Sequence, residues 1–235
     1  MDKRNYKNLG KSVVVVGITA ALSQLLSIGY LVFLARWIGP EAYGLHVAIF
    51  NLCAISAFVV NWGLDTWLLK KTSDDQLSSM NVLRIVLVLK LSFGALWAVM
   101  LFSIAPLLKP EIFLRNLLIL AILSTLLESL TNSIYTVLLT TDRFKQSSAI
   151  LLLDRLSRLG SLVGLYLLSI NNLSIIISLR TLIDLLVLII AGLIFGLRFT
   201  DWKIAPEGLK NAFTNALPFH ASDIEIGRAS CRERV

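Results

Sequence analysis

The sequence predicts an all-α, polytopic membrane helix bundle, and three observations support this fold class. The chain has 235 residues, of which 56% are hydrophobic and only 16% charged, and its mean hydropathy is +0.77. A soluble domain of this length needs a more polar surface. Apolar segments long enough to cross a bilayer recur along the chain, without the period-two alternation of a membrane β-barrel.

Six segments are long and apolar enough to span a membrane. They are expected to be helical because backbone polar groups in lipid must be paired within their own segment. The prolines lie at or near the ends of these segments and never in the middle of one, as helices require. In chain order, the predicted spans cover residues 12–35, 43–69, 82–108, 112–140, 147–169 and 173–197.

Local signals delimit these spans in turn. The first is too long for the apolar region of a signal peptide, so it is expected to remain in the protein. It ends at Gly39-Pro40, and Glu41 favours the start of the second helix. Basic loops follow the second and fourth spans, and the uncharged pair Asn171–Asn172 separates the fifth from the sixth.

Basic residues predict the orientation. Twelve lysines and arginines precede span 1 or follow spans 2, 4 and 6, whereas the alternate connections hold three. The positive-inside rule therefore predicts a cytoplasmic N-terminus in a multi-pass protein. The net charge of +7 is then a matter of topology, with membrane lipids and not nucleic acid as the partner.

Several ionisable residues fall at membrane depth, where they are costly and usually face a bundle interior or a watery cavity. Two pairs, Asp154–Arg158 and Arg180–Asp184, are spaced to meet on one helix face. We expect a substrate-binding cavity, although ion pairs and hydrogen bonds that merely join helices are the alternative. The candidate substrate-binding residues are Arg155, Arg158, Arg180, Glu128, Asp184 and, beside a hydroxyl stripe in span 1, Gln24.

The residue types favour binding of an anion over catalysis. Arginine offers a fork of donors that matches phosphate or carboxylate oxygens. The sequence shows no nucleophile–base arrangement, metal-ligand cluster or glycine-rich phosphate loop, so we expect no enzyme and no cofactor. Elsewhere, Lys90 is expected to reach the interface through its long stem, Asp65 is expected to be structural, and Trp97 lies deeper than aromatic belts do.

Two stretches carry a family resemblance. The run "LARWIGPEAYGLHVAIFNL", from Leu34, and the run "NWGLDTWLLKKTSDD", ending at Asp75, resemble the N-terminal signature of Wzx-like oligosaccharide flippases. These polysaccharide biosynthesis membrane proteins belong to the multidrug/oligosaccharidyl-lipid/polysaccharide exporter superfamily. The shared pattern is a Gly-Pro-Glu-aromatic-Gly corner after span 1 and a Gly-Leu-Asp segment near the end of span 2.

The resemblance implies a function and a larger architecture. Family members carry 12 to 14 spans as two six-helix lobes around a central cavity. They move an undecaprenyl-pyrophosphate-linked oligosaccharide across the inner (plasma) membrane by alternating access, for O-antigen, capsule or exopolysaccharide synthesis. The implied partners are this lipid-linked oligosaccharide, membrane lipids and a C-terminal lobe that is missing from this chain.

The expected organisation follows from that comparison. Residues 1–212 are predicted to be the six-helix N-terminal lobe with its cytoplasmic connector, 213–226 the start of a truncated seventh span, and 227–235 a non-native tail. Alternative functions are a cation-coupled multidrug antiporter, in which Glu128 and Asp184 bind ion and drug, a membrane polysaccharide polymerase, and a non-transporting scaffold.

Overall fold

The protein is a bundle of long helices packed side by side. The computed structural model describes residues 3–74, 79–108, 115–197 and 212, and these ranges are helical apart from short turns. Residues 198–211, which include the predicted connector, lie outside the described residues. The predicted segments 213–226 and 227–235 lie outside them as well. The helices are α1 (Lys3–Ile38), α2 (Pro40–Ser56), α3 (Phe58–Asn61), α4 (Leu64–Asp74), α5 (Ser79–Leu108), α6 (Arg115–Thr140), α7 (Phe144–Leu167) and α8 (Leu173–Phe195).

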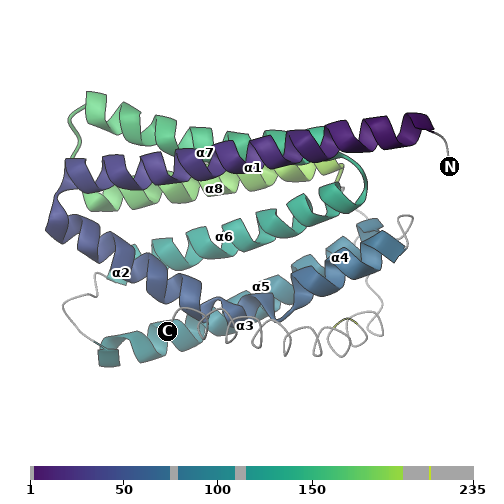
Figure 1. Ribbon diagram of the computed structural model, residues 1–235. Helices are drawn as coiled ribbons and strands as arrows, with labels where there is room; N and C mark the ends of the chain where they lie inside the picture. Colours follow the sequence, from purple (N-terminus) through teal and green to yellow (C-terminus); the bar gives the residue numbers. More distant parts are fainter. Residues whose placement is uncertain (1–2, 75–78, 109–114, 198–211, 213–235) are drawn as a thin grey trace, which may run out of the picture.

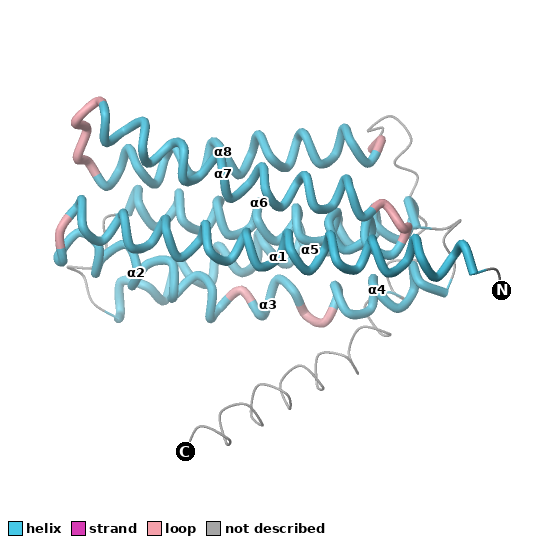
Figure 2. The backbone as a smooth tube through the Cα atoms, turned by 45° about the horizontal axis from the view of Figure 1, so that its top comes forward, coloured by secondary structure: helices cyan, strands magenta, loops and turns pink. Residues whose placement is uncertain are grey.

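The long helices alternate in direction, as the predicted up-and-down topology requires. The start of α1 and the α6–α7 turn lie at one end of the bundle (Figure 1). The α1–α2 corner and the α7–α8 turn lie at the opposite end in both backbone views (Figure 2). The predicted all-α polytopic bundle is confirmed.

Five helical stretches in the described residues are long and apolar enough to cross a membrane: Val14–Ile38, Pro40–Asn61, Ser79–Ser103, Asn116–Thr140 and Leu173–Phe195. The predicted fifth span corresponds to α7, a helix of 24 residues that is not among them. Its interior charges, Asp154, Arg155 and Arg158, make it more polar than the others. Because α7 packs against α1 and α8, those charges lie between helices.

The predicted second span, 43–69, is wrong as a single helix. Helix α2 ends before Ala57, and the short α3 is followed by Trp62 and Gly63, both left-handed with φ of 35° and 68°. A left-handed tryptophan costs roughly 1–2 kcal/mol, so surrounding contacts must hold the break. A continuous apolar run gives no warning of this interruption, since hydropathy reports burial and not backbone conformation.

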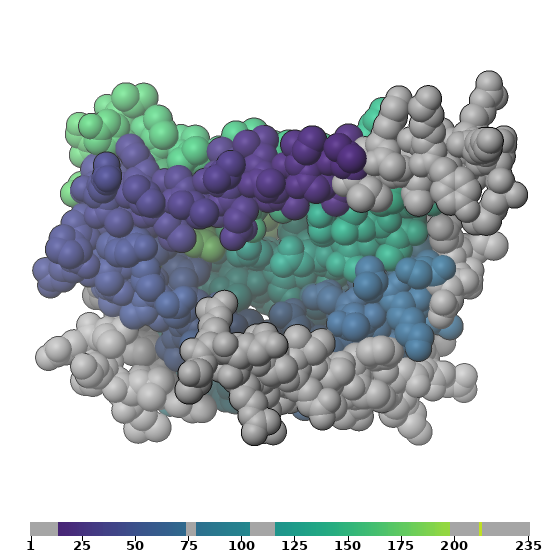
Figure 3. Space-filling view, in the orientation of Figure 1, coloured from purple at the N-terminus to yellow at the C-terminus, as the bar shows by residue number. Residues whose placement is uncertain are grey.

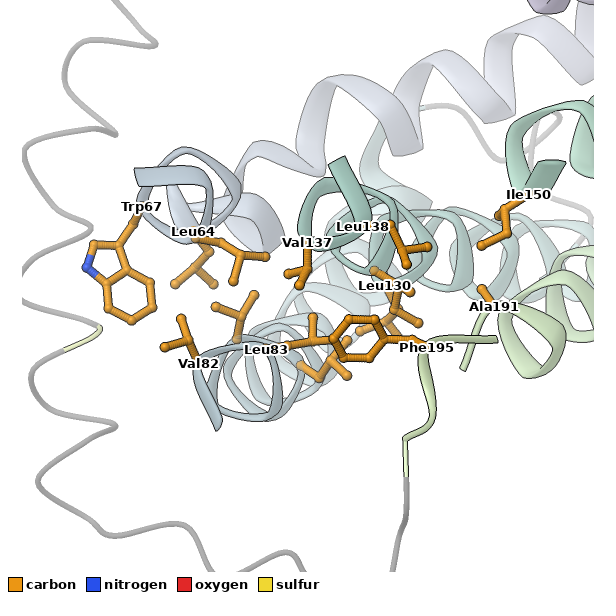
Figure 4. Close-up of a cluster of buried hydrophobic side chains, with 14 of the residues drawn as sticks. Leu64, Trp67, Val82, Leu83, Leu130, Val137, Leu138, Ile150, Ala191 and Phe195 are labelled. Carbon is orange, nitrogen blue, oxygen red and sulfur yellow. The ribbon is translucent and has the colours of Figure 1, made fainter. Parts of the chain in front are cut away.

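Aliphatic packing joins the helices around α6. One cluster, shown in Figure 4, brings Leu64 and Trp67 of α4 and Val82 and Leu83 of α5 against α6, and Phe195 of α8 lies beside Leu130 of α6. A second cluster joins α2, α5 and α6, and a third joins α1, α7 and α8. Helix α6 is therefore the central element of the bundle.

The corner between α1 and α2 is a one-residue turn. Gly39 has φ +81°, a value that favours glycine, and Pro40 occupies the first turn of α2. The Tyr43 N–H donates to the Gly39 carbonyl at 3.0 Å, which begins α2 at once. The predicted tight hairpin is confirmed.

Candidate functional site

Five of the six predicted site residues meet at the middle of the bundle, around Glu128 of α6. Three guanidinium groups converge on this carboxylate. The Nη2 atom of Arg155 lies 3.7 Å from Oε1, whereas the Nη2 atoms of Arg158 and Arg180 lie 3.4 and 3.6 Å from Oε2. Helices α6, α7 and α8 thus each contribute charges to one cluster.

Arg158 also holds two other carboxylates at closer range. Its Nε lies 2.9 Å from Oδ1 of Asp154, and its Nη2 lies 2.9 Å from Oδ1 of Asp184. The other oxygen of Asp184 accepts a hydrogen bond from the Ser124 hydroxyl. Asp154 also lies 3.5 Å from Nε of Arg155. These two aspartates are therefore each held by two neighbouring side chains.

The predicted same-helix pairs have different outcomes. The Asp154–Arg158 pair is confirmed. The ion pairs that the structure records for Arg180 and Asp184 instead cross to α6 and α7. The guanidinium of Arg180 also lies 3.9 Å from the ring centroid of Phe50 in α2, within the range of a cation–π contact.

The cluster, defined here as Glu128, Asp154, Arg155, Arg158, Arg180 and Asp184, carries three positive and three negative side chains. Burial differs among its members: the side chains of Arg158 and Asp184 are only 7% and 1% exposed, whereas Arg155 and Glu128 are 26% and 30% exposed. Buried charges are tolerated when paired, and the balanced arrangement satisfies that condition.

Two cavities adjoin the cluster. The larger has a volume of about 190 Å³ and is lined by the cluster arginines, Glu128 and residues of α1 that include Ser27 and Tyr30. The Tyr30 hydroxyl lies against Arg180. The smaller, of about 30 Å³, lies between α6, α7 and α8 and includes Asp154 and Asp184 in its wall. Glu128, Arg155 and Arg158 line both cavities.

The larger cavity is suited to a small charged group. It has room for several waters, since about 10–15 Å³ of such space already holds one. The cavity volume is below the roughly 300–1,000 Å³ of sites that enclose drug-sized molecules. In Figure 3 the surface is recessed between α1 and α4, where α6 is visible at depth. A bulky ligand therefore needs space outside this cavity.

Gln24 is the one predicted site residue that the structure does not bring into the cluster. Its side chain is exposed on α1, and it is absent from the linings of both cavities. The site also contains residues that sequence reasoning did not assign to it. Asp154 could have been included from its spacing to Arg158, and Ser124 from its place four residues before Glu128 in a polar stripe of span 4. Tyr30 and Phe50 gave no signal, because their contacts link distant parts of the chain.

A second polar network lies on another side of α6. Lys90 is fully buried, and its Nζ lies 2.8 Å from each carboxylate oxygen of Asp65. The same ammonium donates to the backbone and side-chain oxygens of Ser129, both at 3.0 Å. The expectation that Lys90 reaches the interface is wrong, because a carboxylate is available at membrane depth.

The Lys90 network also holds the broken segment between α2 and α4. Ser129 donates at 2.7 Å to Oδ1 of Asn61, just before the left-handed pair, and Ser133 donates at 2.8 Å to Asp65, just after it. Irregular backbone at membrane depth is tolerated where protein surrounds it. Asp65 is therefore structural, as expected.

The arrangement of the cluster favours binding of an anion. Three arginines line the larger cavity, and the buried Nε of Arg180 has no hydrogen-bond partner in the part of the chain that the structure describes. Within those same residues, no group of three or more His, Cys, Asp or Glu side chains is placed to hold a metal ion.

Comparison with known proteins adds one finding. The family model described as "Polysaccharide biosynthesis protein" matches residues 33–224, most of the chain. No curated protein and no solved structure matches it.

Proposed function

The chain belongs to the polysaccharide biosynthesis protein family, and from this membership we propose that it is a flippase for a lipid-linked oligosaccharide. Family membership supports a role in polysaccharide biosynthesis. The apolar helices support a membrane protein. The proposed substrate is an undecaprenyl-pyrophosphate-linked oligosaccharide, which moves from the cytoplasmic to the outer leaflet without any bond being made or broken.

One observation carries this proposal: three arginines from two helices converge beside a cavity at the middle of the bundle. A pyrophosphate group is the part of such a substrate that most resists transfer through hydrocarbon. Guanidinium groups replace its hydration with matched donors. The cavity volume of about 190 Å³ suits this charged group alone, so the sugar would lie in the recess outside.

We place the protein in the inner membrane with its N-terminus in the cytoplasm. The charge distribution supports this orientation, and the structure puts the start of α1 at the same end of the bundle as the basic α6–α7 turn with Arg143 and Lys145. The outward corner is then the α1–α2 turn at Gly39.

A cation-coupled multidrug antiporter is a weaker candidate. It needs carboxylates free to bind an ion and a drug. Asp184 lies 2.9 Å from Arg158, and Glu128 lies within 3.7 Å of three arginines, so an entering cation would meet their positive charge. A polymerase would require a carboxylate placed to act as an acid or base, whereas each carboxylate of the cluster lies against an arginine.

Deletion of the gene tests the proposal. A flippase mutant should lose surface polysaccharide and accumulate lipid-linked repeat units on the cytoplasmic leaflet of the inner membrane, with unchanged drug susceptibility. A polymerase mutant would instead carry single repeat units on the cell surface. A drug antiporter mutant would keep its polysaccharide and become more susceptible to toxic compounds. Either of the last two results contradicts the proposal.

A further inference from the structure

Glu128 is held differently from the two aspartates of the cluster. Asp154 and Asp184 each lie 2.9 Å from a nitrogen of Arg158, within the usual distance range of close ion pairs. Glu128 lies 3.4–3.7 Å from its three arginines, beyond that range. Its charge is therefore shared among three cations, at longer distances than the closest ion pairs of the two aspartates.

Glu128 and Asp154 also differ in which cavities they line. Glu128 lines both cavities, whereas Asp154 lines only the smaller one. The Glu128 side chain is 30% exposed, compared with 13% for Asp154 and 1% for Asp184. The carboxylate of Glu128 thus stands where an anion entering the larger cavity would meet the arginines.

We propose that Glu128 is an exchangeable counter-ion for the three arginines of the cluster. The pyrophosphate group of the substrate displaces Glu128 on binding, and Glu128 displaces that group again on release. The inference rests on the proposed function and adds the regulation of its site. While Glu128 pairs with the arginines, the cluster is neutral and stable in the membrane. When the substrate binds, its phosphates take over the same three guanidinium groups.

The exchange explains how a strongly cationic site releases its ligand. Without Glu128, only the two aspartates would oppose the three arginines, and the remaining positive charge would slow the release of a pyrophosphate. A tethered carboxylate competes at high effective concentration and weakens binding without a clash. Glu128 should therefore lower affinity and raise the rate of turnover, two effects that a purely structural ion pair would not produce together.

The test compares the full chain in nanodiscs with its Glu128→Gln variant, using inorganic pyrophosphate and farnesyl pyrophosphate as probes. Glu128→Gln should bind both probes about tenfold more tightly and, in proteoliposomes, should move a fluorescent prenyl-pyrophosphate oligosaccharide more slowly. Tighter binding of the prenyl probe than of the inorganic one, in both proteins, would assign the site to a lipid-borne group. Glu128→Ala serves the same purpose if the glutamine variant does not fold.

Glu41→Gln is the matched control, because it makes the same change in an exposed glutamate at the start of α2 that lines neither cavity. Its affinity for either probe should change less than about threefold. Equal or weaker binding by Glu128→Gln and Glu128→Ala, with normal binding by the unmodified chain, overturns the exchange and leaves the flippase proposal standing. Absence of binding by every form overturns both.

Discussion

The indole N–H of Trp97 donates a hydrogen bond of 2.9 Å to the hydroxyl of Ser56, the last residue of α2. Trp97 is fully buried, deeper than the interfacial belts where tryptophans gather. The bond accounts for this depth, because it ties α5 to α2 immediately before the helix breaks at Ala57. The Trp97 side chain therefore helps to hold the end of α2 in place beside the interruption.

Ser56→Ala should destabilise the bundle, because it leaves the buried indole N–H without its acceptor. An unpaired buried donor costs about 1–3 kcal/mol, measurable as a lower midpoint of thermal unfolding in detergent. Ser92→Ala is the control, since the Ser92 hydroxyl is exposed and donates only to its own helix. Equal midpoints for the two variants would refute the role given to Trp97.

Gly39→Ala should destabilise the α1–α2 corner, whereas Gly44→Ala should not. Gly39 has φ +81° and Gly44 has no such strain, and neither has a heavy atom within 4 Å of an added Cβ. A left-handed alanine costs roughly 1–2 kcal/mol. The comparison of unfolding midpoints isolates backbone strain from steric contact, and a matching loss at Gly44 would contradict this explanation.

Lys90→Met should be strongly destabilising, because it leaves the Asp65 carboxylate without its cation. Breaking a buried pair costs about 3–5 kcal/mol. Since the Asp65 side chain is 34% exposed, we expect about 2–3 kcal/mol here. The double variant Lys90→Met with Asp65→Asn should recover part of this loss, measured by denaturant unfolding. If the double variant loses as much unfolding free energy as the two single variants added together, Lys90 and Asp65 contribute no pairing energy.

Arg155→Gln should reduce transport with little loss of stability. The Arg155 side chain is 26% exposed and its ion pairs are 3.5 and 3.7 Å long, so its loss should cost no more than about 1 kcal/mol. Transport by proteoliposomes should nevertheless fall, since the arginine lines both cavities. Unchanged transport by this variant would remove Arg155 from the substrate site.

Arg158→Gln should unfold the protein more readily than Arg155→Gln, because three carboxylates depend on Arg158. Its side chain is 7% exposed, and the expected cost is about 3–5 kcal/mol. Gln24→Ala, on an exposed part of α1, should keep both stability and transport. Loss of transport in Gln24→Ala would restore Gln24 to the site.

Hydropathy and the cost of charge in lipid predicted the bundle and most of its central cluster. Glu128, Arg158 and Asp184 could be selected because each is expensive at membrane depth, whatever its partner. The choice of partners could not be predicted, since Arg180 contacts Phe50 and Glu128 on two helices far away in the sequence. The break after Asn61 was also hidden, because its supports are contacts with residues far away in the sequence.

Helix α6 places neighbouring residues in separate polar networks. Glu128 faces the arginines of α7 and α8, whereas Ser129 accepts from Lys90 of α5 and donates to Asn61. Successive residues on a helix project about 100° apart, so axial rotation of α6 would break both networks together. Any motion of the bundle that keeps both networks intact must therefore move these helices as one rigid unit.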